Sequence, residues 1–111
     1  MGATLQRGYT AQLAAASAAL YTCPTGTRAR VLKCTATNDT TTAVTFNIYL
    51  VPSGSGEGVT NLLINTKTLG DKDSYTCPEV VGHVLEPGDA IEGVASVADQ
   101  VTIVLSLVEL T

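Results

Sequence analysis

The segment that most constrains the fold is residues 44–51, VTFNIYLV, in which apolar and more polar side chains alternate. A period of two is typical of an antiparallel strand with one face in a core and the other near solvent. The apolar face consists of Val44, Phe46, Ile48 and Leu50. The opposite face consists of Thr45, Asn47, Tyr49 and Val51. This segment is therefore predicted to be a half-buried strand.

Similar short segments, separated by turn residues, cover most of the chain. Turns are expected at Pro24–Gly26, Asn38–Thr40, Gly70–Asp73 and Glu86–Asp89, and the last of these has the Pro-Gly order of a type II turn. A long Gly- and Ser-rich loop is expected at 52–58. The predicted strands are 18–22, 28–38, 44–51, 61–69, 74–77, 90–97 and 101–110, and residues 80–85 are expected to form a further short strand or a connection. Strands at this spacing predict an all-β, antiparallel β-sandwich of seven or eight strands, either jelly-roll or immunoglobulin-like.

Two of these strands depart from simple alternation. In 28–38, a bulge near Leu32 and Lys33 would bring Val31, Cys34 and Ala36 to the same face. The strand 101–110 is apolar on both faces. We expect one of its faces to meet the other sheet, and the second to meet the N-terminal segment or another subunit.

The chain has 111 residues, a length that fits one domain. Residues 1–17 lack a clear strand pattern and are predicted to form an extended N-terminal arm. Residues 18–111 are predicted to form the single sandwich domain. An arm of this kind can add a strand to the sheet edge of a neighbouring protein.

Charge and hydropathy exclude two classes of partner. The net charge is −4, and the six basic residues do not form a long run, so nucleic-acid binding is not expected. No run of 18 apolar residues is present, so no membrane span is expected. With 14% charged residues, the surface is expected to be largely neutral and available for protein contacts.

No constellation of residues indicates catalysis or a cofactor. His83 is the single histidine, and no Gly-x-Ser-x-Gly sequence accompanies it. Asp71 and Asp73 enclose a lysine, which works against a cation site. We therefore expect no catalytic, cofactor-binding or metal-ligating residues, and no enzyme activity.

The chain contains three cysteines, Cys23, Cys34 and Cys77. Their spacing matches no zinc pattern, and an odd number argues against a secreted disulfide scaffold. Cys34 lies in phase with Ala36 and is predicted to be a small buried hydrophobe. We expect reduced thiols and folding in a cytoplasm, while a Cys23–Cys77 bridge remains an alternative.

Four stretches resemble small β-sandwich virion proteins of tailed bacteriophages, a group that includes capsid decoration (cement) proteins. They are Tyr21-Thr22-x-Pro24-x-Gly26-Thr27-x-Ala29, Thr35-x-Thr37-Asn38, Tyr49-Leu50-Val51-Pro52-Ser53-Gly54 and Leu85-x-Pro87-Gly88-Asp89. The resemblance covers roughly residues 18–110. It implies a structural role in the virion, without enzymatic activity or cofactor.

The leading hypothesis is a capsid decoration protein, assembled in the host cytoplasm as a homotrimer and bound to the major capsid protein. It would bind through the N-terminal arm and the sandwich end that carries residues 24–30. The alternatives are a neck, tail or fibre component, and a host- or glycan-binding module that uses the loop 53–58. The candidate interface residues are Leu5, Arg7, Tyr9, Leu13, Arg28, Arg30, Val104 and Val108.

Overall fold

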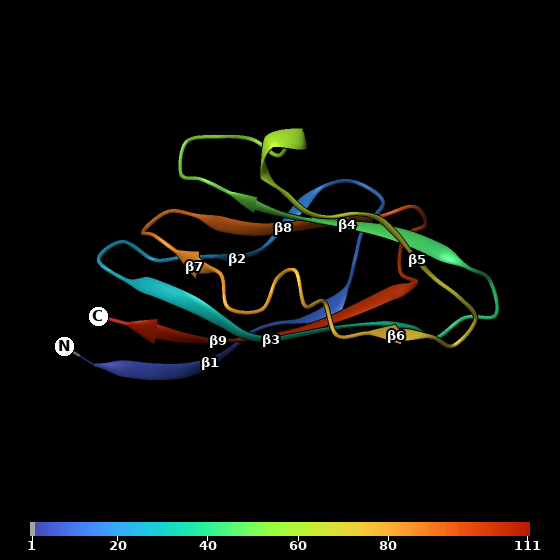
Figure 1. Cartoon of the computed structure of the whole chain (residues 1–111), viewed down its shortest axis with the longest axis horizontal. Coiled ribbons are helices and arrows are strands. Elements are labelled where there is room, and N and C mark those ends of the chain that lie inside the picture. The colour runs from blue at the N-terminus through green and yellow to red at the C-terminus, as the bar shows by residue number, and fades with distance from the viewer. Residues whose placement is uncertain (1) are drawn as a thin grey trace.

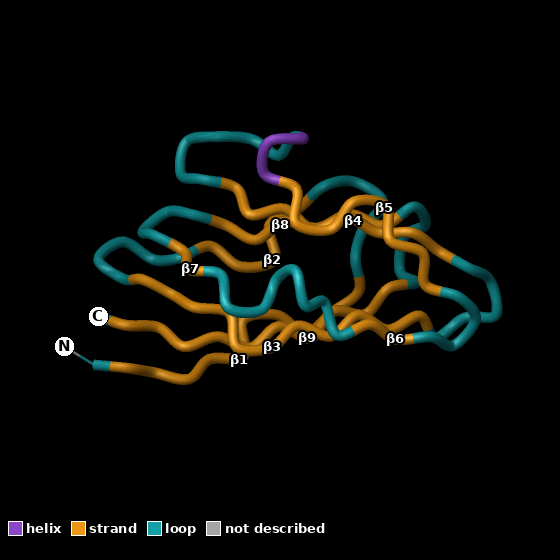
Figure 2. Tube along the Cα trace, viewed as in Figure 1, coloured by secondary structure: helices purple, strands orange, loops and turns teal. Residues whose placement is uncertain are grey.

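The computed structural model describes residues 2–111 as two antiparallel sheets packed face to face (Figure 1). The five-stranded sheet has the order β1-β9-β3-β6, with β7 also paired to β3. The four-stranded sheet has the order β2-β8-β4-β5. Figure 2 shows the two layers of strands and the loops that join them at the ends of the molecule. The predicted all-β antiparallel sandwich is thus confirmed.

Within the described residues the strands agree closely with the sequence pattern, apart from one addition, β1. The short strands β6 and β7 are only parts of the predicted segments 74–77 and 80–85. A turn of 3-10 helix, η1 (Val59–Asn61), precedes β5. The strand bounds are β1 Ala3–Gln12, β2 Ala18–Thr22, β3 Arg28–Asn38, β4 Val44–Val51, β5 Leu62–Leu69, β6 Ser74–Tyr75, β7 Val84–Leu85, β8 Ala90–Ala95 and β9 Val101–Leu110.

The segment that the sequence predicted to be an arm contributes β1, the edge strand of the five-stranded sheet. It pairs with β9 from Ala3↔Leu110 to Gln12↔Thr102, so residues 3–12 lie in the sandwich and not outside it. The register shifts between Arg7 and Tyr9, which is a bulge. This shift breaks the period of two, and it explains why alternation is hard to recognise there.

The core lies between the two sheets and is built mainly from aliphatic side chains. On β9, Val101, Ile103, Leu105 and Leu107 are fully buried. Phe46 and Ile48 of β4 face them from the opposite sheet. The alternation predicted for β4 holds through Ile48. At the end of the strand Leu50 is only half-buried while Val51 is buried, next to a shift in the pairing of β4 with β5.

The predicted bulge in β3 is present. The register of β3 against β9 shifts between Val31 and Lys33, and Leu32 is left exposed. Val31, Cys34 and Ala36 are consequently all buried. The bulge therefore allows one strand to keep its apolar residues in the core along its whole length.

The N-terminal segment, one of the two coverings expected for the outer face of β9, does not cover that face. Residues 3–12 pair along the edge of β9 and do not lie across its second face. Val104 and Leu110, which point away from the core, remain exposed. This face is the starting point for the site described below. No helix within residues 2–111 has the length and apolar character needed to cross a membrane.

Gly8, at the bulge of β1, should be sensitive to substitution. A Cβ atom at this position would lie 2.4 Å from Leu107 Cδ1 and 3.2 Å from Tyr21 Cδ1. We expect Gly8→Val to lower the free energy of unfolding by about 2 kcal/mol, because a buried side chain must move to make room. Gly56→Val is the matched control, since no atom lies within 4 Å of a Cβ there. Urea denaturation of both variants measures the difference; equal stabilities would contradict the packing of β1.

Candidate docking face

The most distinctive surface of the molecule is the outer face of the five-stranded sheet, formed by β1, β9, β3 and β7. Because side chains alternate along a strand, every second residue of these strands points away from the core. Paired positions on neighbouring strands point to the same face, so the register shows which residues lie side by side. We call this surface the docking face and define it by Leu5, Arg7, Arg28, Arg30, Lys33, Val84, Val104, Val108 and Leu110.

The register arranges these residues in rows across the strands. Leu5 of β1 pairs with Val108 of β9, which pairs with Arg30 of β3, which in turn pairs with Val84 of β7. In the next row, Arg7 and Lys33 lie on either side of Ser106. The first row therefore contains three apolar side chains and one cation, and we call it the apolar row. The second row carries two cations.

The apolar members of the docking face are unusually open to solvent. Leu5 is 77% exposed, Val84 53%, Leu110 45% and Val104 38%. Single exposed apolar residues are normal, but several on one face are typical of a binding surface. Because the residues of the docking face lie on four neighbouring strands, they form a broad sheet surface and not a cleft.

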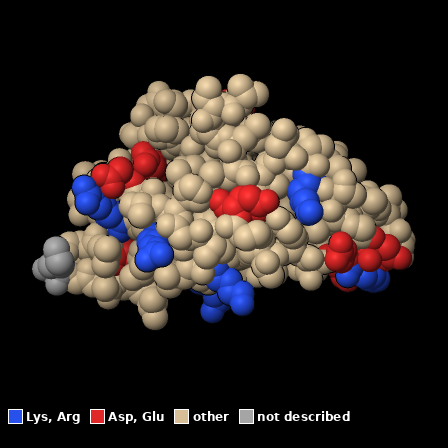
Figure 3. Space-filling view, viewed as in Figure 1, with Lys and Arg blue, Asp and Glu red and all other residues tan. Residues whose placement is uncertain are grey.

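The docking face is also basic, although the chain as a whole is acidic. It carries Arg7, Arg28, Arg30 and Lys33, four of the six basic residues. No Asp or Glu occupies an outward position of β1, β9 or β3, all of which lie within the described residues. In Figure 3, Lys and Arg atoms project from the lower surface, the side on which the five-stranded sheet lies.

Most of these cations are not neutralised within the chain. Arg28 forms an exposed ion pair with Glu86, with 3.1 Å between Nε and Oε2. Within residues 2–111, Arg7, Arg30 and Lys33 form no ion pair. An exposed pair such as Arg28–Glu86 contributes little to stability, so its charges are available to a partner.

A hollow of about 480 Å³ lies at one end of the docking face. Arg28 and Leu110 belong to both the face and this hollow. The remaining lining comes from turns and the end of β9: Gly26, Thr27, Pro87 and Thr111. The sandwich end that the sequence analysis selected, residues 24–30, therefore adjoins the docking face.

The structure places the eight predicted interface residues in two groups. Six of them share the docking face: Leu5, Arg7, Arg28, Arg30, Val104 and Val108. Tyr9 and Leu13 do not. Tyr9 pairs with the inward-facing Leu105 and packs against the core, and Leu13 is 1% exposed.

Three members of the docking face were missed by the sequence analysis. Lys33 joins Arg7 because the bulge at Leu32 shifts the phase of β3. Leu110 lies on the same face of β9 as Val104 and Val108 and is exposed near the end of the strand. Val84 belongs to a strand of only two residues, for which the sequence carries no periodic signal.

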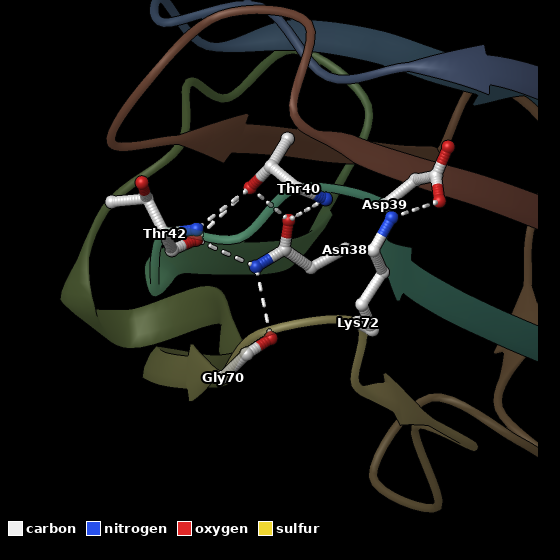
Figure 4. A network of polar contacts seen from close by, with 6 residues as sticks. All are labelled: Asn38, Asp39, Thr40, Thr42, Gly70 and Lys72. Carbon is white, nitrogen blue, oxygen red and sulfur yellow. Dashed lines mark hydrogen bonds and ion pairs between the residues drawn. The ribbon is translucent and has the colours of Figure 1, made fainter.

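A buried polar cluster lies at the opposite end of β3 from Arg28 and is centred on Asn38 (Figure 4). The Asn38 side chain is fully buried, and its amide donates to the carbonyls of Thr42, Leu69 and Gly70 at 2.9, 3.2 and 3.0 Å. Its Oδ1 accepts from the Thr40 amide at 3.0 Å and the Thr40 hydroxyl at 2.7 Å. Every polar atom of the side chain is used for structure, so the cluster positions loops and leaves nothing to bind a ligand.

The other residues considered for chemistry are dispersed. His83 is exposed. Within residues 2–111, no group of three or more His, Cys, Asp or Glu side chains is arranged to hold a metal ion. Cys23, Cys34 and Cys77 are all free and buried. The alternative Cys23–Cys77 bridge is not formed, and the Cys23 thiol donates to the Thr27 carbonyl at 3.2 Å.

Comparisons with known proteins give only distant structural likenesses. No protein-family model matches the chain, and no curated protein matches it. The fold is similar to a chain in a structure of infectious bursal disease virus Gx strain, with 12% identity, a TM-score of 0.49 and coverage of 97% of this chain and 31% of that one. It is also similar to a chain in the crystal structure of the VP2 subviral particle of infectious bursal disease virus, with 12% identity, a TM-score of 0.45 and coverage of 97% and 32%. The protein thus spans about a third of the length of these chains.

Proposed function

We propose that this protein is a structural component of a virion, and that it acts as a capsid decoration protein by binding major capsid subunits through the docking face. The single observation that carries the proposal is the docking face itself. It is broad, apolar and basic, and the hollow at its end is lined mostly by apolar atoms and not by the convergent polar groups that small-molecule sites usually have. A surface of this kind suits contact with another folded protein.

The strand order supports this proposal at the level of the fold. In a jelly roll, eight strands form two sheets in which the first strand pairs with the last, and the last pairs with the third. In the five-stranded sheet, β1, β9 and β3 follow this order. The strands β2, β8, β4 and β5 form the second sheet. β6 and β7 together take the place of one interrupted strand. Jelly rolls are frequent in viral capsid proteins, which makes this an argument by analogy of fold and favours the jelly-roll over the immunoglobulin-like alternative.

The sequence resemblance to small virion proteins of tailed phages points in the same direction. A decoration protein acts in many copies, each of which adds a modest interface between shell subunits. The docking face contains apolar side chains for such an interface and cations that orient it. In this role the protein has no enzymatic activity, needs no cofactor and binds neither nucleic acid nor membrane; it is located in the virion after assembly in the host cytoplasm.

We further propose that copies associate as a homotrimer through the edge of the four-stranded sheet. β5 is an edge strand, and its first half, Leu62–Asn65, carries no charge. Unprotected edges of this kind pair readily with another chain. This arrangement leaves the docking face free for the capsid.

The proposal is tested by binding the purified protein to undecorated, expanded shells of the major capsid protein from the same virus. We expect saturable binding at a fixed ratio to capsid subunits and a higher melting temperature of the shell. Light scattering of the free protein after size exclusion should give three times the mass of the 11.4 kDa chain. Failure to bind shells under all conditions, together with binding to neck, tail or fibre assemblies, would replace decoration by that alternative.

One observation favours a different class, a host- or glycan-binding module. The loop 53–58 is exposed along almost its whole length and projects from the four-stranded sheet, on the side away from the docking face (Figure 1). Lectin domains also include jelly rolls. A glycan array in which the protein binds a sugar, and in which deletion of residues 54–57 abolishes the signal, would support this function over decoration.

A further inference from the structure

Cys34 lies in β3, and Cys77 lies two residues beyond the end of β6, which pairs with β3. β3 and β6 pair in the register Ala36↔Tyr75 and Thr37↔Ser74. The pairing ends at Tyr75, and extension of its register by two residues would place Cys77 across from Cys34. Residues so placed on antiparallel strands have Cα atoms about 4.5–5.5 Å apart. A disulfide joins Cα atoms about 4.4–6.8 Å apart, so this placement would allow a bridge without a large movement of the backbone.

The surroundings of the two thiols are consistent with this pairing. Cys34 is 1% exposed and Cys77 0%, and both belong to the core. The thiols interact directly: hydrogen bonding with Cys34 is the largest cause that raises the pKa of Cys77, while the same interaction lowers the pKa of Cys34. Cys23 has different neighbours, the carbonyls of Thr27 and Leu85.

We propose that Cys34 and Cys77 form a reversible redox pair that closes into an intramolecular disulfide on reaction with a low-molecular-weight disulfide such as oxidised glutathione. In the first exchange, the Cys34 thiolate attacks one sulfur of the small disulfide, forms a mixed disulfide and releases one thiol. In the second, the Cys77 thiolate attacks the Cys34 sulfur, forms the protein bridge and releases the second thiol. Two protein thiols are thereby oxidised and one small disulfide is reduced to two thiols.

Access to the buried thiols requires local opening of the segment that carries Cys77, which follows the two paired residues of β6. β6 contains two residues, and the chain between β6 and β7 is not part of any strand. Cys77 itself has a φ of 47°, a left-handed conformation that costs energy for a residue other than glycine. Local opening of this segment exposes both thiols without unfolding of the two sheets.

Closure of the bridge would tie β3 to the segment after β6. The chain between the two cysteines contains β4, η1, β5 and β6. A bridge across so long a loop restricts the unfolded chain strongly. We expect oxidation to raise the melting temperature by about 5–10 °C, after allowance for some strain in the folded state. Outside a host cell, a virion meets oxidising conditions that the cytoplasm lacks. The redox pair is inferred from the positions of the two cysteines and does not rest on the proposed virion function.

The test uses the Cys23→Ala variant, which retains only the proposed pair, and the wild-type protein. Each is incubated with oxidised glutathione, and thiols are then counted under denaturing conditions. We expect loss of both thiols in the variant, a mass lower by two hydrogen atoms, and a Cys34–Cys77 crosslink in non-reduced peptide maps of both proteins. Dithiothreitol should restore the thiols and the original melting temperature.

Cys34→Ala and Cys77→Ala in the Cys23→Ala background are the matched controls. Each should form at most a mixed disulfide with glutathione and should show no rise in melting temperature. Because either substitution can destabilise the core, the peptide map of the wild-type protein provides an independent readout. A crosslink that includes Cys23, crosslinked dimers, or unchanged thiols after local opening with mild denaturant would each overturn the proposal.

Discussion

Replacement of Asn38 by Leu should lower the free energy of unfolding by about 3–4 kcal/mol, one of the largest effects expected for any single change in this protein. Leu has the same branched shape with bulkier ends, and its side chain can neither donate nor accept a hydrogen bond. The carbonyls of Thr42, Leu69 and Gly70 would lose the donor that they share, and the Thr40 amide would lose its acceptor. Buried polar groups without partners carry the full cost of their desolvation.

Asn38→Asp separates the role of the donor from that of the acceptor. The introduced carboxyl group keeps an oxygen for the Thr40 amide and hydroxyl but points a second oxygen toward three carbonyls. Its charged form is then disfavoured in the folded state, so the pKa of this carboxyl group should be raised above its unfolded value. The variant should therefore be closest to wild type at low pH, and it should lose stability as the pH rises through the unfolded and then the folded pKa.

Urea denaturation between pH 3 and pH 7 measures both variants. Gln12→Leu is the control, since Gln12 is an exposed amide on β1 and should change stability by less than about 0.5 kcal/mol. If Asn38→Leu proves as stable as Gln12→Leu, the network in Figure 4 does not hold the two loops together.

The sequence was sufficient for those parts of the fold that are set by local alternation and turn chemistry. The bounds of β4 and the bulge of β3 follow from side chains that must reach the core. The turn 86–89 also forms as expected, with Gly88 at a φ of 88° and a hydrogen bond of 3.0 Å from the Asp89 amide to the Glu86 carbonyl. In each case neighbouring residues carry the information.

The sequence was insufficient where distant segments decide the outcome. β1 is a strand because β9 offers it an edge over ten residues, and the bulge at Gly8 conceals its alternation. The sequence predicts a turn at Asn38. The carbonyls that accept from its buried amide include those of Leu69, at the end of β5, and Gly70, which follows it. Cys77 was considered as a partner of Cys23, whereas the pairing of β3 with β6 brings the segment after Tyr75 near Cys34.

The same reasoning applies to the candidate site. Arg28 and Arg30, two of the candidate interface residues, lie on the same face of β3. Their neighbours on the docking face, however, come from β1, β9 and β7, and no spacing along the chain predicts this grouping. Tyr9 and Leu13 were assigned to the N-terminal arm. Tyr9 lies in β1, Leu13 directly follows β1, and both pack within the sandwich.

Reversal of charge on the docking face should abolish binding to undecorated shells. In Arg7→Glu/Lys33→Glu, two carboxylates would replace the cations on either side of Ser106. If the partner surface is acidic, as the basic face suggests, attraction changes to repulsion between groups that approach closely. Juxtaposed like charges cost several kcal/mol, so we expect affinity to fall by at least about 100-fold.

Lys67→Glu/Lys72→Glu is the matched control, because it changes the net charge by the same amount at the two basic residues outside the docking face. Lys72 forms an exposed pair with Asp39, and Lys67 lies 4.5 Å from the centre of the Tyr75 ring, so both are surface groups. This control should bind shells with nearly wild-type affinity. A loss equal to that of Arg7→Glu/Lys33→Glu would mean that net charge, and not the docking face, governs binding.

Salt dependence distinguishes the basic and apolar contributions of the docking face. Wild-type affinity should fall as ionic strength rises, because the Debye length shortens from about 10 Å at 0.1 M to about 3 Å at 1 M. Binding that remains at high salt reports the apolar row, and Leu5→Ser should weaken it because Leu5 is the most exposed member of that row. The apolar row provides contact area that would suit many protein partners, whereas the flanking cations restrict the partner to an acidic one. Both contributions are therefore needed for the docking face to select one surface of the shell.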